Sequence, residues 1–135
     1  MFTSVSAAET EAAGARVAQQ VRAGEVLALA GDLGTGKTQF VKGFARGLGS
    51  SVPVTSPTFT LLHEYGGGRL FIHHFDFYRL ENLTALEAIG FDEYIFGNGV
   101  SIIEWADRFP SAIPGHARWI RFHMLSPHER AIELE

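Results

Sequence analysis

A chain of 135 residues that is 46% hydrophobic and 19% charged can bury a core, so we expect residues 1–135 to form a single folded domain. The net charge of −4 and the scattered arginines argue against strong direct binding to nucleic acid, and the absence of cysteine excludes disulfides and thiolate metal sites. No signal peptide and no membrane-spanning apolar run are evident, so we expect no membrane contact and a cytoplasmic location.

The N-terminal part of the chain predicts a helix, a buried strand and a second helix. Apolar residues at helical spacing behind a capping box at Ser6 predict a helix from Ala7 to Arg22. The short apolar run from Glu25 to Ala30, followed by glycine, is typical of a buried strand. Apolar side chains share one face of a helix predicted from Lys37 to Leu48, which ends before Gly49.

The remainder of the chain alternates strands and short helices. The segments from Val54 to Tyr65 and from Leu70 to Phe77 flank three glycines and predict a hairpin. Further predicted elements are a short helix at Leu83 to Ile89, a helical turn at Asp92 to Phe96, and strands at Val100 to Trp105, Trp119 to Leu125 and Ala131 to Leu134. This mixture predicts an α/β fold with three layers around a central mixed, largely parallel sheet.

The segment between the first strand and the second helix matches the phosphate-binding pattern G-x-x-x-x-G-K-[ST] completely. This P-loop consists of Gly31, Asp32, Leu33, Gly34, Thr35, Gly36, Lys37 and Thr38. Its glycines let main-chain N–H groups converge on phosphate oxygens, and the following helix adds the positive end of its dipole. Lys37 supplies an ammonium group for the β- and γ-phosphates, and the Thr38 hydroxyl can bind Mg²⁺. We therefore expect a P-loop NTPase-like ATPase domain with ATP and Mg²⁺ as cofactors.

Two acidic residues end apolar strands and are candidates for the metal and reaction centre. Glu104 follows the run VSII, and Asp76 ends a run that begins at Leu70. Ligands collect at the carboxyl ends of parallel strands, so both acids can face the phosphates. We predict Glu104, Asp76 and Lys37 as catalytic residues, and Thr38, Glu104 and Asp76 as Mg²⁺ ligands. Each acid could instead cap a strand or pair with an arginine on the surface.

Three further features each allow more than one interpretation. The hydroxyl-rich segment from Thr55 to Thr58 is either a switch that senses the γ-phosphate or an ordinary entry into a strand. His73 and His74 are adjacent on a strand, so their side chains point to opposite faces and cannot easily share a metal. Trp105 follows Glu104 directly and either stacks on a base or partner or packs in the core.

Four sequence blocks together resemble the TsaE family. GDLGTGKT at 31–38, SPTFTL at 56–61, HFDFYRL at 74–80 and IEWAD at 103–107 have the family's order and rough spacing. The resemblance runs from about Ser6 to Phe109. It implies an ATPase that works on the TsaB–TsaD complex, which installs threonylcarbamoyladenosine in tRNA. ATP hydrolysis would permit repeated turnover of that complex, and contact with tRNA would be indirect.

The same resemblance implies roles for single residues. It implies nucleotide contacts by Thr10 and Trp105, with Thr10 near the base. It implies that Asp76 and Glu104 lie near the metal and reaction centre. It also implies that the segment at 56–58 is the family's switch region.

Other functions share the P-loop. A small kinase would usually need a lid of clustered arginines, and no such cluster is evident in the sequence. A GTPase would need an N-K-x-D segment, which the chain lacks. A nucleotide-gated binding module without useful hydrolysis remains an alternative function. A Glu104→Ala variant would distinguish it from an ATPase. We expect slow hydrolysis by the isolated chain, because docking on the partners completes the site.

Overall fold

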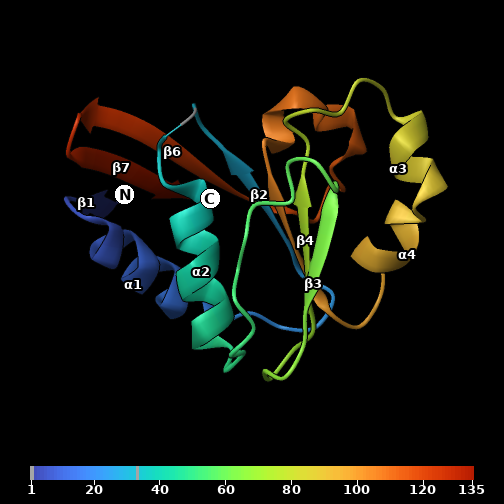
Figure 1. The fold of residues 1–135 in the computed structure, drawn as a ribbon, viewed down its shortest axis with the longest axis horizontal. Helices are drawn as coiled ribbons and strands as arrows, with labels where there is room; N and C mark the ends of the chain where they lie inside the picture. The colour runs from blue at the N-terminus through green and yellow to red at the C-terminus, as the bar shows by residue number, and fades with distance from the viewer. Residues whose placement is uncertain (1, 33) are drawn as a thin grey trace.

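The fold is built on a mixed sheet whose strands come from both ends and the middle of the chain. The computed structural model describes residues 2–32 and 34–135. The strands are β1 (Phe2–Ser4), β2 (Val26–Ala30), β3 (Leu62–Tyr65), β4 (Ile72–Asp76), β5 (Val100–Glu104), β6 (Arg118–Ser126) and β7 (Glu129–Leu134). They lie in the order β1-β7-β6-β2-β5-β4-β3 (Figure 1). Pairing is parallel within the central β6-β2-β5-β4 group and antiparallel in the outer pairs.

Helices cover both faces of this sheet and give the fold three layers. α1 (Ala7–Ala18) and α2 (Lys37–Gly47) pack on one face, and α3 (Thr84–Ala88) and α4 (Phe91–Ile95) pack on the other (Figure 1). Two 3-10 turns, Ala106–Arg108 and Pro110–Ala112, follow β5. The predicted α/β three-layer sandwich with a largely parallel centre is confirmed. Within the described residues, no helix has the length and apolar character needed to span a membrane.

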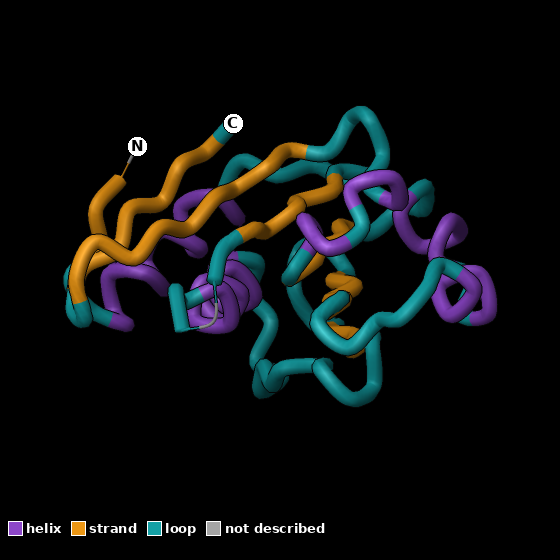
Figure 2. The backbone as a smooth tube through the Cα atoms, turned by 90° about the horizontal axis from the view of Figure 1, so that it is seen from above, coloured by secondary structure: helices purple, strands orange, loops and turns teal. Residues whose placement is uncertain are grey.

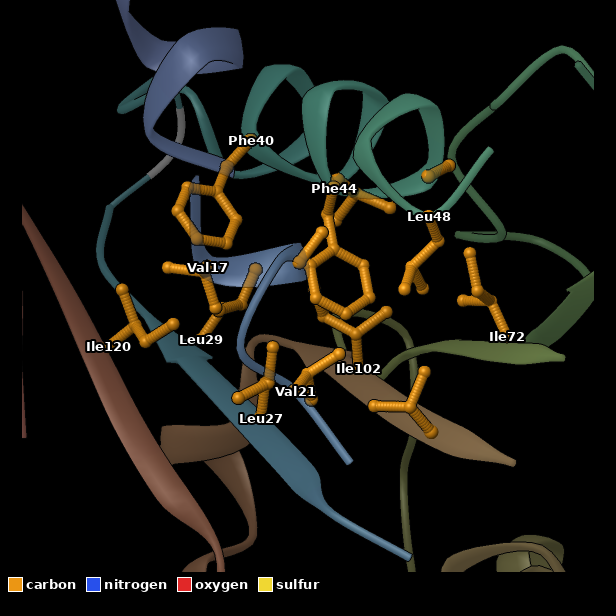
Figure 3. Packing of buried hydrophobic residues seen from close by; sticks show 14 of the residues in the cluster. Val17, Val21, Leu27, Leu29, Phe40, Phe44, Leu48, Ile72, Ile102 and Ile120 are labelled. Carbon is orange, nitrogen blue, oxygen red and sulfur yellow. The ribbon is translucent and has the colours of Figure 1, made fainter. Parts of the chain in front are cut away.

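Two apolar cores join the layers. In the first, Phe40 and Phe44 of α2 pack over Leu27, Leu29 and Ile102 of the sheet (Figure 3). The second core lies on the opposite face and consists of Val26, Ala28, Phe75, Phe77, Leu80, Leu86, Phe91, Ile95, Ile103 and Ala106. Successive strand residues point to opposite faces, so β2 and β5 supply side chains to both cores. The central strands are therefore almost continuously apolar, as strands covered on both faces must be.

The first helix is shorter than predicted, because an arginine distant in sequence binds the main-chain oxygens at and just after its end. The helix stops at Ala18 instead of Arg22. The Arg69 guanidinium donates to the main-chain oxygens of Ala18 and Val21 at 2.6 and 3.0 Å. In a longer helix the Ala18 oxygen would accept from the N–H group four residues on, so the arginine replaces that turn.

Two strand predictions also need correction. The strand predicted from Val54 begins only at Leu62, because the preceding segment contains Pro57 and directs its hydroxyl groups to other partners. β1 is absent from the sequence-based prediction, because a three-residue strand shows no clear periodicity. It forms by pairing with β7, so both ends of the described chain lie at one edge of the sheet (Figure 2). The other predicted elements are present, with ends shifted by at most two residues.

Glycines allow α1 and α2 to pack with their backbones in close approach. A Cβ atom added at Gly43 of α2 would collide with the main-chain oxygen of Glu11 in α1. A Cβ atom at Gly14 of α1 would collide with the main-chain oxygen of Phe40. This contact fixes α2, and therefore the loop that precedes it, against the N-terminal helix.

We expect Gly43→Ala to lower the free energy of unfolding by about 2–3 kcal/mol, because the new methyl group overlaps backbone that cannot move aside freely. The gain in helix propensity, about 1 kcal/mol, offsets only part of this loss. Gly115→Ala is the control, since no atom of the described residues, apart from its chain neighbours, lies within 4 Å of a Cβ added there. Urea unfolding of both variants measures the difference. Equal stability of the two variants would contradict the close contact.

Candidate nucleotide-binding site

The loop between β2 and α2 is shaped by three glycines. Gly31, Gly34 and Gly36 have φ angles of 149°, 80° and 95°, which L-amino-acid side chains rarely adopt. A Cβ atom at Gly31 would lie only 2.7 Å from the carbonyl oxygen of Phe122. Gly36 is the N-cap of α2 and has no side chain to occupy the first N–H groups of that helix. The predicted contact at Leu33 lies outside the described residues.

The Lys37 side chain folds back over its own loop. Its Nζ donates to the carbonyl oxygens of Gly31 and Asp32, the latter at 3.0 Å, and lies 3.8 Å from the centre of the Trp105 ring. Burial lowers the pKa of the Lys37 ammonium group, and attraction to Glu104 and other nearby acids opposes this shift. The ammonium is thus held at the loop by carbonyl dipoles and an aromatic face.

Glu104 stands at the carboxyl end of β5, facing the start of α2. The Thr38 hydroxyl donates to its two carboxylate oxygens at 3.0 and 3.2 Å. On its other side, Nε2 of His74 lies 2.6 Å from Glu104 Oε2. Nδ1 of the same ring lies 2.9 Å from the Tyr65 hydroxyl, which donates to the main-chain oxygen of Thr55 at 3.0 Å. Glu104 is therefore one member of a buried hydrogen-bonded chain, and the sequence indicated only the acid.

Asp76 lies directly beside Glu104, because β4 and β5 pair in parallel with these two residues in register. Its carboxylate accepts hydrogen bonds from the hydroxyls of Thr58 and Ser56 at 2.9 and 3.2 Å, and from the main-chain N–H of Tyr78 at 2.8 Å. The hydroxyl-rich segment is therefore attached to an acid of the site. It does not lead directly into a strand, since β3 begins only at residue 62.

These groups border one cleft of about 650 Å³ between the P-loop, the start of α1 and residues 56–58. The predicted site residues that line it are Thr10, Gly34, Thr35, Gly36, Lys37, Thr38, Asp76, Glu104 and Trp105. Gly31 and Asp32 do not line the cleft, and their carbonyl oxygens hold the Lys37 ammonium instead. The Thr35 hydroxyl donates to the Asp32 oxygen at 2.6 Å and tightens the loop.

Thr10 and Trp105 both line the cleft. Thr10 is buried and its hydroxyl lies 2.7 Å from that of Ser4, while a Cβ atom on Gly36 would lie 3.3 Å from its methyl group. Trp105 is half-buried, packs edge-on against Tyr78 at 4.8 Å between ring centres, and also contacts the second core. Trp105 therefore packs in the core, as one of its two interpretations has it, and also lines the cleft, while stacking on a base or partner stays a prediction.

The fold brings two arginines to the cleft that look scattered in the sequence. Arg130 of β7 donates to the Gly34 carbonyl oxygen through Nη2 and Nε, at 2.9 and 3.2 Å. The Arg79 guanidinium lies 4.2 Å from the centre of the Phe59 ring and also lines the cleft. Arg79 lies in the same sequence block, HFDFYRL at 74–80, as Asp76. Nothing in the sequence distinguishes Arg130, because only the β6–β7 hairpin places it over the loop.

The oxygen atoms at the cleft floor fit Mg²⁺. Thr38, Glu104 and Asp76 present one hydroxyl and two carboxylates, the hard ligands that this ion prefers. The described residues contain no group of three or more His, Cys, Asp or Glu that could hold a metal by itself.

The chain matches a known family along most of its length. A family model described as "Threonylcarbamoyl adenosine biosynthesis protein TsaE" covers residues 4–132. The chain belongs to the TsaE family. The match extends past Phe109, where the resemblance of the sequence blocks ended, and covers β6 and β7 as far as Ile132, including Arg130.

Individual TsaE relatives support this membership. The tRNA threonylcarbamoyladenosine biosynthesis protein TsaE of Bacillus subtilis is 43% identical over 131 residues, which are 97% of this chain and 82% of the relative. The protein of the same name from Treponema pallidum is 43% identical over 127 residues, 94% and 93% of the two chains. A crystal structure of Bacillus subtilis YdiB superposes with a TM-score of 0.84 at 38% identity, covering 98% of this chain and 82% of that one. The expected family and fold are both confirmed.

The burial of the Tyr65 phenol has a consequence for its acid–base behaviour that can be measured. Burial raises the pKa of its phenol from its ordinary value near 10 to about 12. Its neutral form is favoured in the folded protein, so its contribution to stability is complete below pH 10 and is lost as pH rises towards 12.

We expect near-ultraviolet absorbance to show one of the three tyrosines ionising near pH 12, and we expect Tyr65→Phe to remove that step. Tyr78→Phe is the control, because it removes a partly exposed tyrosine and keeps Tyr65, so the step near pH 12 should remain. A wild-type titration that ends near pH 10 would contradict the assigned environment of Tyr65.

Proposed function

We propose that this protein is a Mg²⁺-dependent P-loop ATPase that assists threonylcarbamoyladenosine modification of tRNA. It acts on the TsaB–TsaD complex in the cytoplasm, contacts tRNA only through that complex, and hydrolyses ATP to permit repeated turnover. Membership of the TsaE family supports the pathway. The observation that carries the enzymatic part is the hydrogen bond between Thr38, in the P-loop, and Glu104, at the end of β5.

The P-loop would bind the phosphates of ATP. The N–H groups at the start of α2 point to the same region as the glycine-rich turn, and both favour anionic oxygen. Lys37 would exchange the carbonyl oxygens of Gly31 and Asp32 for the β- and γ-phosphates, while staying against Trp105. This exchange is favourable, because a phosphate oxygen is a stronger acceptor for an ammonium group than a neutral carbonyl.

Thr38, Glu104 and Asp76 would hold Mg²⁺ at the cleft floor. When bound, Mg²⁺ would neutralise charge on the phosphate oxygens and hold them in position. The carboxylates of Glu104 and Asp76 can also orient a water molecule towards the γ-phosphate by accepting its hydrogen bonds. Thr10 and Trp105, on the walls of the cleft, are then in position to contact the rest of the nucleotide.

The segment that binds Asp76 also supports a partner-gated reaction. Residues 56–61 carry Phe59, which is 82% exposed, and place the Ser56 and Thr58 hydroxyls on Asp76. A partner that contacts Phe59 would therefore act on a segment already attached to the site. This arrangement supports the proposal that the isolated chain hydrolyses ATP slowly and that docking accelerates the reaction.

The first test is steady-state ATP hydrolysis by the pure protein, alone and with TsaB–TsaD. We expect slow turnover alone, stimulation by the complex, and a loss of about 100-fold or more in Lys37→Ala. Lys42→Ala is the matched control, because Lys42 is exposed on the same helix. Fast turnover that ignores the complex would overturn the proposal. Phosphate transfer to a small acceptor would favour a kinase, the alternative that Arg79 and Arg130 in the cleft keep open.

A second test separates hydrolysis from binding. We expect Glu104→Gln to lower kcat about 100-fold while ATP still binds, because the amide keeps the shape of the side chain but loses the charge near the metal. Glu93→Gln, an exposed position on α4, is the control. Assays of tRNA modification with both variants complete the experiment. Full modification with Glu104→Gln would favour a nucleotide-gated binding module over an ATPase.

A further inference from the structure

Three buried polar side chains project from adjacent strands on the face covered by α2. They are Tyr65 of β3, His74 of β4 and Glu104 of β5, and each is 3% exposed or less. Their neighbours on the same face, Ile72 and Ile102, belong to the core under α2. Burying polar groups in such a place costs free energy unless each finds a hydrogen-bond partner.

Both ring nitrogens of His74 have partners, which fixes the orientation of the ring. Nε2 lies 2.6 Å from Glu104 Oε2, and Nδ1 lies 2.9 Å from the Tyr65 hydroxyl. The adjacent His73 is different, because it points to the other face and its Nδ1 has no hydrogen-bond partner among the described residues. Its nearest acid, Glu64, is 3.8 Å away. Of these two histidines, His74 is therefore the one that contacts an acid of the site.

The contact with His74 restricts how the Glu104 carboxylate can turn. Oε2 is held by the imidazole, and Oε1 is left beside the Thr38 hydroxyl at 3.0 Å. A carboxylate held at one oxygen presents the other in one direction, which is the requirement for a metal ligand or for orienting water. Without His74, a buried carboxylate would have lost its strongest fixed partner and could rotate away from Thr38.

The series of hydrogen bonds from Glu104 through His74 and Tyr65 ends at residue 55, next to the residues that contact Asp76. Tyr65 donates to the main-chain oxygen of Thr55 at 3.0 Å. The next residues, Ser56 and Thr58, place their hydroxyls on Asp76. One short stretch of backbone is thus connected to Asp76 directly and to Glu104 through two side chains.

We propose that His74 is a positioning residue for Glu104, and that Tyr65 links this pair to residues 55–58, so that one segment controls both acids of the cleft. The inference deepens the proposed ATPase function and rests on it for the role of Glu104. His74 belongs neither to the P-loop motif nor to the pair of acids, and this proposal gives it a role. A partner that contacts the exposed Phe59 would then act on both acids through this segment.

The test compares His74→Leu with His74→Gln and with His73→Leu. Leucine removes the hydrogen bond, whereas the amide nitrogen of glutamine can reach the place of Nε2 and restore it. We expect His74→Leu to lower kcat 10- to 100-fold and to raise the Mg²⁺ concentration for half-maximal activity, with little change in KM for ATP. We expect recovery in His74→Gln and no change in His73→Leu. Equal kcat and Mg²⁺ dependence in wild type and His74→Leu would overturn the inference.

Tyr65→Phe tests the link to the segment. It keeps the ring and its packing but removes the hydroxyl between His74 and Thr55. We expect stimulation by TsaB–TsaD to fall at least threefold more than the unstimulated rate does. If both rates fall equally, or neither falls, the link to the segment is wrong, whatever the result for His74.

A binding measurement keeps this inference separate from the proposed function. ATP affinity is measured with and without Mg²⁺, after thermal unfolding has shown that the variants are folded. We expect Mg²⁺ to strengthen ATP binding to the wild type and to His74→Gln, and to strengthen it several-fold less in His74→Leu. If the wild type binds but does not hydrolyse ATP, the proposed function fails while this comparison still tests His74. If the wild type hydrolyses ATP and His74→Leu responds fully to Mg²⁺, only the inference fails.

Discussion

The hydrogen bond from Thr38 to Glu104 joins the P-loop to the acidic residues of the cleft. The sheet and the helices hold these two residues in position. Thr38 stands in the first turn of α2, and Glu104 is the last residue of β5. Parallel pairing of β2, β5 and β4 brings the strand ends to one edge, and the register adds Asp76 beside Glu104. The close packing of α1 on α2 then fixes the helix that carries the hydroxyl.

Such a cluster of buried charge is stable only because each member is paired. Glu104 is paired with Thr38 and His74, and Asp76 with two hydroxyls and a main-chain N–H. Lys37 is held by two carbonyl oxygens and an aromatic ring. Breaking one of these pairs would leave an unsatisfied buried group, which costs more than the bond itself contributes. The polar network is therefore both a stabilising element of the cleft and a constraint on how it can change.

The sequence predicts those parts of the site whose signal is local. The P-loop follows from one unbroken motif, and the acids follow from apolar runs that end in a carboxylate. A contact whose decisive partner is distant in sequence has no such signal. Arg69 shortens α1 from a remote loop, and Arg130 reaches the P-loop only because the β6–β7 hairpin folds over it. His74 could be assigned to a face of its strand, but the contact with Glu104 depends on a register that no single segment encodes.

The hydrogen bonds from Arg130 to the Gly34 carbonyl oxygen have a consequence for the biosynthesis of the protein. Gly34 and Arg130 are separated by 96 positions, so a ribosome makes the loop long before it makes the side chain that contacts it. While the chain grows, the loop and α2 can pack on α1, but β7 and the arginine are still to come. A nascent chain halted in the β6–β7 turn would carry the complete phosphate-binding motif without this support. During translation this contact therefore forms only after the chain has been made as far as β7.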